Sequence, residues 1–175
     1  MEPFAEVLLA GGHSNSLGRS GEVLELLRRD PARLDELFAC IAADDAWVRM
    51  RAVDTFEKLV REDPPRGVPY TERVLDELTA SDQPSVQWHT AQLFGLLTLT
   101  DAQRRRAVDW LLARVATTDV DWIVSAQSMA TLVALHDEGA VPTEDLVQRL
   151  EVQTGHHSAS VRRKASAFLE AVRRS

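Results

Sequence analysis

The sequence predicts an all-α fold built from about four stacked helix pairs. The first observation is an internal repeat, in which a β-branched residue opens a helical run at intervals of 38, 37 and 38 residues: Val48, Val86, Ile123 and Val161. Such a period indicates stacked units that share a core, because one unit cannot bury its apolar face alone. The second observation is that apolar residues follow helical spacing, and the third is that no segment shows the alternation typical of a strand.

The first 30 residues lie outside the repeat and predict an N-terminal loop followed by a capping helix. We expect this helix over residues 22–29, with Ser20 or a neighbour as its N-cap. Val23, Leu26 and Leu27 would then cover the open end of the first repeat. A terminal repeat needs such a cover, because its outer face has no neighbour.

Each repeat begins with a first helix, marked by two adjacent apolar residues and a third one three positions later. This pattern occurs at Leu37, Phe38, Ile41; Val74, Leu75, Leu78; Leu111, Leu112, Val115; and Leu146, Val147, Leu150. Asp30 before Pro31 is expected to cap the first of these helices, and Thr100 with Gln103 predicts a capping box. The Pro-rich residues 62–67 predict a turn between helices. One domain, 1–175, would then contain repeats at about 31–66, 67–100, 101–138 and 139–175.

The second helix of each repeat shows apolar residues at offsets 4, 7, 8 and 11 from the β-branched residue. The four copies are Ala52, Thr55, Phe56, Leu59; Thr90, Leu93, Phe94, Leu97; Gln127, Ala130, Thr131, Ala134; and Ala165, Phe168, Leu169, Val172. These offsets share one helical face, which is expected to be the buried one. The third copy is the most polar.

The start of each second helix carries a motif that resembles the HEAT-repeat (armadillo-like) family. The motif stretches are DDAWVRMRA at 44–52, SDQPSVQWHT at 81–90, HSASVRRKA at 157–165 and the looser TDVDWIVSAQ at 118–127. Over residues 31–175 the chain looks like a small bacterial HEAT-repeat protein. The resemblance implies a right-handed α-α superhelix, or solenoid, whose second helices line the concave side. It also implies a ladder of bonds between turn Asp and helix Arg, in which Arg49 and Arg162 match the family pattern and Gln87 and Val124 depart from it.

Composition narrows the function classes. The chain has 175 residues and a net charge of −7, which opposes broad contact with nucleic-acid phosphates, although residues 155–175 are basic. The single Cys40 cannot form an internal disulfide and is expected to fill the core rather than to act as a nucleophile. No apolar run is long enough to span a membrane, and no signal peptide is evident. We therefore expect a cytoplasmic protein that is a monomer or a weak oligomer.

One face of the second helices is the strongest functional candidate. Large apolar side chains are expected to point away from the core of their own helix, at Trp47, Met50, Trp88, Trp122 and Met129, with the polar Gln92 and Ser125 among them. Exposed aromatic and Met side chains are typical of protein-binding surfaces. The competing interpretation is that Trp47 and Trp122 fold back over the preceding loop or onto the next repeat.

A flank of this face carries polar groups. Arg51 and His89 would place cations beside the aromatic residues, with Lys164 further along, and such a groove would suit an acidic or carboxylate-bearing peptide. Alternatively, these groups are solvated or form internal pairs such as Arg51 with Asp54.

The Gly-rich segment 11–21 suggests a weaker site. Its glycines superficially resemble a phosphate loop, but five residues separate them where four are required, Arg19 replaces the Lys, and no strand leads in. A loop anion site at His13, Arg19 and Ser20 remains a weak candidate.

No catalytic, metal-binding or cofactor-binding motif is found. The adjacent His156 and His157 lack a nearby third ligand, and a turn before the last helix is their simpler role. We therefore expect a noncatalytic scaffold or adaptor that binds a protein or peptide, and no cofactor. The alternative is a nucleic-acid-acting enzyme resembling the HEAT-like alkylpurine DNA glycosylases, in which Trp47, Trp88 and Asp54 would hold a damaged nucleotide. A relative of the chromophore lyases ranks third, because only the repeat type supports it.

Overall fold

The computed structural model describes residues 2–11 and 16–174, and these residues form helices and turns without any strand. The long helices are α2 (Ser20–Arg29), α4 (Ala46–Glu62), α6 (Pro84–Leu93), α7 (Asp101–Arg114), α8 (Trp122–Asp137), α9 (Thr143–Gln153) and α10 (Ala159–Val172). The shorter segments are α1 (Phe4–Leu9), η1 (Pro31–Arg33), α3 (Leu34–Cys40), η2 (Pro64–Tyr70), α5 (Thr71–Arg73) and the π-helical η3 (Val74–Leu78). The all-α prediction is confirmed for the described residues.

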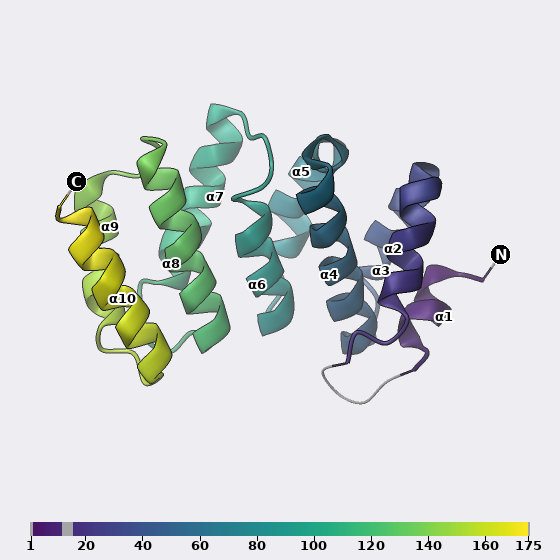
Figure 1. Cartoon of the computed structure of the whole chain (residues 1–175), viewed down its shortest axis with the longest axis horizontal. Coiled ribbons are helices and arrows are strands. Elements are labelled where there is room, and N and C mark those ends of the chain that lie inside the picture. The colour runs from purple at the N-terminus through teal and green to yellow at the C-terminus, as the bar shows by residue number, and fades with distance from the viewer. Residues whose placement is uncertain (1, 12–15, 175) are drawn as a thin grey trace.

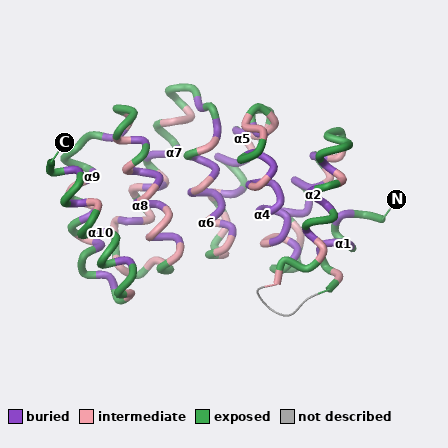
Figure 2. Tube along the Cα trace, in the orientation of Figure 1, coloured by how far each residue is buried: buried purple, intermediate pink, exposed green. Residues whose placement is uncertain are grey.

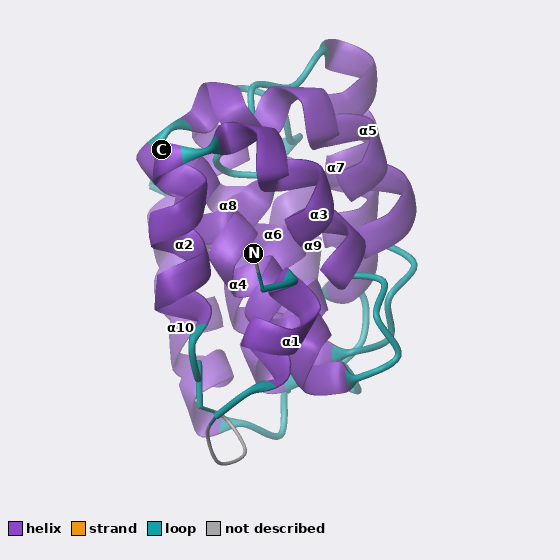
Figure 3. Ribbon diagram, turned by 90° about the vertical axis from the view of Figure 1, so that its right-hand side faces the viewer, coloured by secondary structure: helices purple, strands orange, loops and turns teal. Residues whose placement is uncertain are grey.

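The helices form two rows that follow the order of the chain (Figure 1). Helices α2, α4, α6, α8 and α10 lie side by side in one row, and each contacts the next. Helices α3, α7 and α9, together with the α5–η3 segment, lie behind them, as the end-on view in Figure 3 also shows. Each helix of the second row packs on the following helix of the first row, so the predicted helix pairs are present.

The core lies between the two rows. Buried positions recur along the inner side of every long helix (Figure 2). Phe38 and Phe56 meet edge to face with ring centroids 5.2 Å apart, and Tyr70 stacks on Phe38 at 5.1 Å. Further along, Phe94 meets Trp110 edge to face at 5.7 Å. Such pairs stabilise a core beyond the area they bury, by roughly 0.5–1.5 kcal/mol each.

The N-terminal end is covered by two helices. Helix α2 begins at Ser20, two residues before the expected start, and buries Val23 and Leu27 against α4 as predicted, while Leu26 is only partly buried. The sequence did not predict α1, a helix of 6 residues that contacts α2, α3 and α4. Its Phe4 is fully buried. The cover of the first repeat is therefore a pair of helices.

The capping predicted at Asp30 and at Thr100 is confirmed, whereas no side chain caps the start of α2, where Ser20 or a neighbour was expected to do so. The Asp30 side chain accepts a hydrogen bond from the Ala32 amide at 3.2 Å, although the helix begins as a 3₁₀ turn. Thr100 and Gln103 form the reciprocal capping box. The chain does leave the helix at the predicted turn, since α4 ends at Glu62 and a 3₁₀ segment follows. Gly67 in this segment packs against Val60 and Leu97.

A recurring bond fixes the turn before three of the four second helices. Nη1 of Arg49 donates to the carbonyls of residues 43 and 44, both at 2.8 Å, and Nη1 of Arg162 donates in the same way to residues 156 and 157, at 2.7 and 2.8 Å. Gln87, expected to break the pattern, donates to the Ser81 carbonyl at 2.8 Å. These bonds stay within one unit. Gln83 also links the first two units, since it donates to the Ala46 carbonyl and accepts from Arg49.

The register predicted for the third second helix is wrong by one residue. The fully buried residue that corresponds to Val48, Val86 and Val161 is Val124, whereas Ile123 is only half-buried. The predicted core residue Ala134 is accordingly exposed, while Ser125, Met129 and Leu132 are buried. The two β-branched neighbours were indistinguishable by spacing alone, and the N-cap Asp121 decides between them. It precedes Val124 by the same three residues that separate Asp45 from Val48.

Candidate binding cleft

A cleft of about 610 Å³ opens between the N-terminal parts of α4, α6 and α8. Ten residues line it: Leu17, Met50, Asp54, Pro84, Ser85, Trp88, His89, Asp121, Trp122 and Ile123. Its volume lies within the range of small-molecule sites, and three neighbouring helices supply most of its walls. The cleft therefore brings together the predicted candidates Met50, Trp88, His89 and Trp122.

The rim of the cleft is aromatic and apolar. Trp122, the first residue of α8, is 50% exposed, and Trp88 is half-buried. An adjoining hollow of about 450 Å³ shares Met50 and Ser85 with the cleft and adds Trp47, which is 37% exposed. Large apolar side chains on a surface mark interaction sites when they gather in one place. The exposure of Trp47 and Trp122 favours the outward direction over the alternative in which both fold back over a loop or a neighbouring repeat.

The inner part of the cleft is polar and almost closed to solvent. Oδ2 of Asp54 accepts a hydrogen bond from Nζ of Lys58 at 2.7 Å. Oδ1 of Asp54 lies 3.8 Å from Nε2 of His89, a residue that is 3% exposed. Burial lowers the pKa of His89 to about 4, although the Asp54 carboxylate opposes this shift. His89 is therefore neutral near pH 7, and its Nδ1 has no hydrogen-bond partner among the described residues.

Asp121 places a second carboxylate at the mouth of the cleft. Its Oδ1 accepts a hydrogen bond from the Ile123 amide at 2.9 Å and so caps α8. The residue is exposed, and it takes part in no ion pair with the described residues. Capping occupies only part of the hydrogen-bonding capacity of a carboxylate, and the negative charge remains.

Arg51 does not contribute to this surface, contrary to prediction. It is 2% exposed, and its guanidinium donates to the carbonyls of Leu8 at 2.5 Å and Ser16 at 2.9 Å. It therefore fastens the N-terminal segment to α4. The alternative internal pair of Arg51 with Asp54 is also absent, because Lys58 takes the Asp54 carboxylate. With Arg51 buried and His89 neutral, the predicted cationic flank does not form.

Three other candidates lie elsewhere. Ser125 and Met129 are fully buried, because the register of α8 turns them toward its neighbours, so their predicted exposure is wrong. Gln92 lines a separate hollow of about 300 Å³ between α6 and α8, together with Gln127 and Arg61. The candidate face is thus confined to the N-terminal parts of the second helices.

The weak anion site has no support. His13 lies outside the described residues, and Ser20 is buried without acting as a side-chain cap. The Arg19 guanidinium is held by the carboxylates of Glu2 and Glu22, at 2.9–3.1 Å. An anion would have to displace both carboxylates.

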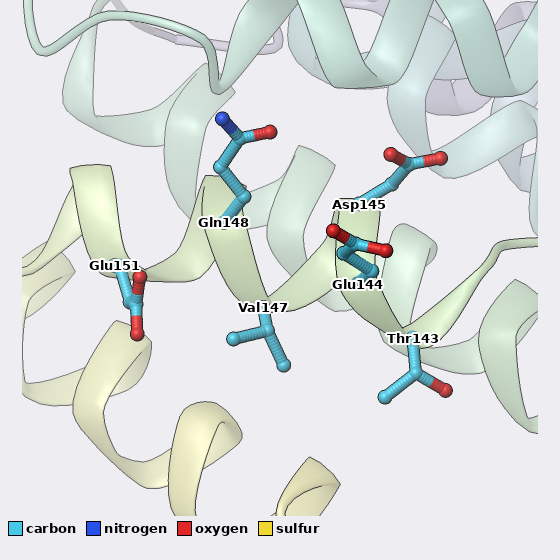
Figure 4. Close-up of a pocket in the computed structure, with 6 residues that line it drawn as sticks. All are labelled: Thr143, Glu144, Asp145, Val147, Gln148 and Glu151. Atoms are coloured by element: carbon cyan, nitrogen blue, oxygen red, sulfur yellow. The ribbon is translucent and has the colours of Figure 1, made fainter.

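A further hollow, of about 630 Å³, lies on α9 (Figure 4). All six of its lining residues come from this one helix, and Figure 4 shows Glu144 and Asp145 at one end and Glu151 at the other. Side chains along one exposed helix face solvent rather than each other.

Within the described residues, no group of three or more His, Cys, Asp or Glu side chains is placed to hold a metal ion. His156 is buried, and its ring bonds the Val120 carbonyl and the Ser158 amide, both at 3.0 Å.

Several cleft residues were not predicted: Leu17, Pro84, Ile123 and, as a site residue, Asp121. Capping is by itself a sufficient role for a carboxylate just before a helix, and the distance between Asp121 and Trp88 in sequence hides their shared cleft. The constant spacing of the caps before each second helix was the available signal, since residues at equivalent turns of a repeat lie along one edge of the stack.

Trp110, the remaining tryptophan, is structural. Its Nε1 donates to the Thr79 carbonyl at 3.2 Å, and its ring packs on Phe94.

Among the described helices, none combines the length and the apolar character that crossing a membrane requires. Comparison with protein-family models, with curated proteins and with solved structures gives no match to this chain.

Proposed function

We propose that this protein is a noncatalytic scaffold that binds a peptide segment of another protein on the N-terminal parts of α4, α6 and α8. The supporting observation is the cleft of about 610 Å³ with Trp88, Trp122 and Met50 in its walls. Of the five exposed large apolar residues in the described chain, Leu17, Trp47 and Trp122 border this cleft or its neighbour. Side chains of this type supply most of the binding energy at protein interfaces.

The proposal includes the finer architecture. We propose a right-handed solenoid of HEAT-like pairs in which this cleft lies on the concave side, and a cytoplasmic location for the protein. The side-by-side order of α2, α4, α6, α8 and α10 supports this arrangement. So does the recurring bond from Arg49, Gln87 and Arg162 to the preceding turn. The HEAT resemblance itself stays a prediction.

Selection from an unbiased peptide display library tests the binding function. We expect enriched peptides whose binding is lost in Trp88→Ala and Trp122→Ala, with intact folding checked by circular dichroism. Val68→Ala is the matched control, because Val68 is 47% exposed but lies on η2 outside the cleft. Peptides that bind both tryptophan variants as well as the native chain would contradict the proposal, as would a selection without enrichment.

The alternative of a nucleic-acid-acting enzyme receives less support. Asp54 and Trp88 do share the cleft, but the Asp54 carboxylate is engaged by Lys58, and Trp47 lies in the adjoining hollow. The ten lining residues include no Lys or Arg to contact phosphates. Micromolar affinity for duplex DNA that falls steeply with salt would favour this alternative.

A further inference from the structure

We propose that the cleft between α4, α6 and α8 binds an arginine side chain of a partner peptide, inserted between its tryptophans and its carboxylates. This inference rests on the proposed function and specifies the ligand of the same site. It reverses the expectation from the sequence that the groove accepts an acidic peptide. Three properties of the cleft support it: its charge, its incompletely hydrogen-bonded inner wall and its aromatic walls.

The charge of the cleft favours a cation. Its lining contains the carboxylates of Asp54 and Asp121 and no Lys or Arg side chain. Lys58 lies beside Asp54 and offsets one of these charges, so the exposed Asp121 carries the net negative charge at the mouth. A basic ligand is therefore complementary to the cleft and to the acidic protein as a whole, whose net charge is −7.

The adjoining hollow does not reverse this balance. It contains Asp82 and one cation, Arg49. Nε of Arg49 donates to Gln83 Oε1 at 2.8 Å, and its Nη1 donates to two turn carbonyls, so this guanidinium is committed to the fold. A ligand carboxylate would have to compete with these bonds, whereas a ligand cation meets no such competition.

The inner wall contains polar atoms that the protein does not fully hydrogen-bond. Nδ1 of His89 is buried and has no hydrogen-bond partner among the described residues. Oδ1 of Asp54 is 3.8 Å from the nearest histidine nitrogen, beyond hydrogen-bond distance. A buried polar atom without a partner is costly unless a ligand or water satisfies it. Guanidinium carries five N–H donors and no acceptor, and it therefore suits such a wall.

The aromatic walls favour arginine over lysine. Trp88 and Trp122 belong to neighbouring helices and line the same cleft. The planar guanidinium stacks on indole faces and is more weakly hydrated than an ammonium group, so it loses less hydration on entering a half-closed site. The methylene stem of arginine would pack on Met50 and Leu17.

Nuclear magnetic resonance on the full chain provides the test. The probes are the capped pentapeptide Gly-Gly-Arg-Gly-Gly and its citrulline, lysine and glutamate counterparts, titrated to millimolar concentration. With the arginine peptide, we expect saturable shifts of the indole N–H signals of Trp88 and Trp122. The signal of Trp110 serves as an internal reference, because its N–H is bonded to Thr79 on another part of the fold.

A matched pair of variants isolates the charge. Asp121→Asn removes the carboxylate but keeps an N-cap acceptor, since Asn caps as well as Asp. We expect it to weaken arginine-peptide binding about two- to fivefold, the range of an exposed ion pair. Asp45→Asn is the control, because Asp45 caps α4 in the same way but does not line the cleft.

The outcomes separate this inference from the proposed function. Citrulline or lysine peptides that bind as tightly as arginine would overturn the arginine assignment, and so would tighter binding of the glutamate peptide. An absence of shifts at Trp88 and Trp122 with the arginine peptide would overturn it as well. In each case the display selection still decides whether the cleft binds peptides at all.

Discussion

Nε2 of His89 lies 3.8 Å from Oδ1 of Asp54, at the closed end of a cleft whose open end carries Trp122. This pair combines a buried imidazole with a carboxylate that is already bonded to Lys58. The nearby positive charges of Lys58 and Arg61 add to the effect of burial, and the imidazole stays neutral down to about pH 4.

The depressed pKa of His89 predicts acid sensitivity of the fold. In the unfolded chain a histidine takes up a proton near pH 6.5, whereas folded His89 takes it up only near about 4. The free energy of unfolding should therefore fall as the pH drops from about 6.5 to 4, with a His89 contribution of about 1–3 kcal/mol. Urea titrations across this range, compared between the native chain and His89→Gln, measure that contribution. His157→Gln, at an exposed position, is the control, and equal pH slopes for the native chain and His89→Gln would contradict the prediction.

Replacing Arg51 is expected to reduce stability locally, at the N-terminal helices, rather than throughout the protein. Arg51→Lys removes the fork of donors that reaches the carbonyls of Leu8 and Ser16, and a charged hydrogen bond of this kind contributes about 1.5–3 kcal/mol. We expect faster hydrogen exchange in α1 and in the start of α2, measured by mass spectrometry, with little change in α8 and α10. Arg105→Lys on the exposed side of α7 is the control. A uniform increase in exchange throughout the chain would show that Arg51 has another role.

Cys40 is expected to be unreactive in the folded protein. It is 6% exposed, its Sγ donates to the Glu36 carbonyl at 3.3 Å, and burial raises the pKa of its thiol to about 11. The thiolate is the reactive form, so labelling by Ellman's reagent at pH 8 should be slow in native buffer and complete in guanidinium chloride. Glutathione provides the reference rate. A native rate close to that of glutathione would refute the interpretation of Cys40 as a core residue.

The hydrogen bonds of Gln153 predict that the fourth helix pair stabilises the third. Its Nε2 donates to the carbonyls of Val115 at 3.1 Å and Thr117 at 2.7 Å. Gln153→Leu removes both bonds and leaves these carbonyls unpaired, which should cost about 1–3 kcal/mol of unfolding free energy. Chemical denaturation checks the cost, with Gln148→Leu on the exposed side of α9 as the matched control. Equal stability of the two variants would contradict this role.

The helix pairs and the capping box at Thr100 were predictable from the sequence, because they depend on local spacing, whereas spacing left the direction of Trp47 and Trp122 open between two interpretations. The sign of the charge in the cleft was not predictable in this way. Arg51 was assigned to the surface from its helical position. Its guanidinium instead donates hydrogen bonds to carbonyls of an N-terminal segment 35 to 43 residues away in the chain. Helical spacing does not reveal which remote backbone a long side chain will reach.

The third second helix shows a further limit of sequence reasoning. A choice between the adjacent residues Ile123 and Val124 rotates the whole helix by one position, and this rotation decides whether Met129 is exposed or buried. The second helices α4, α6 and α8 are also covered on both flanks by their neighbours, so the exposed arc of each is narrower than a single core direction implies.

The turn before α8 lacks the bond from its own helix that Arg49, Gln87 and Arg162 make elsewhere, because the equivalent residue is the short Ser125. Gln153 and His156 hold residues 115, 117 and 120 from the next unit instead. The turn that carries Asp121 and Trp122 is therefore held in place by Gln153 and His156, which do not line the cleft. We therefore expect that trimming the chain from its C-terminal end disturbs the proposed binding cleft before any residue that lines the cleft is removed.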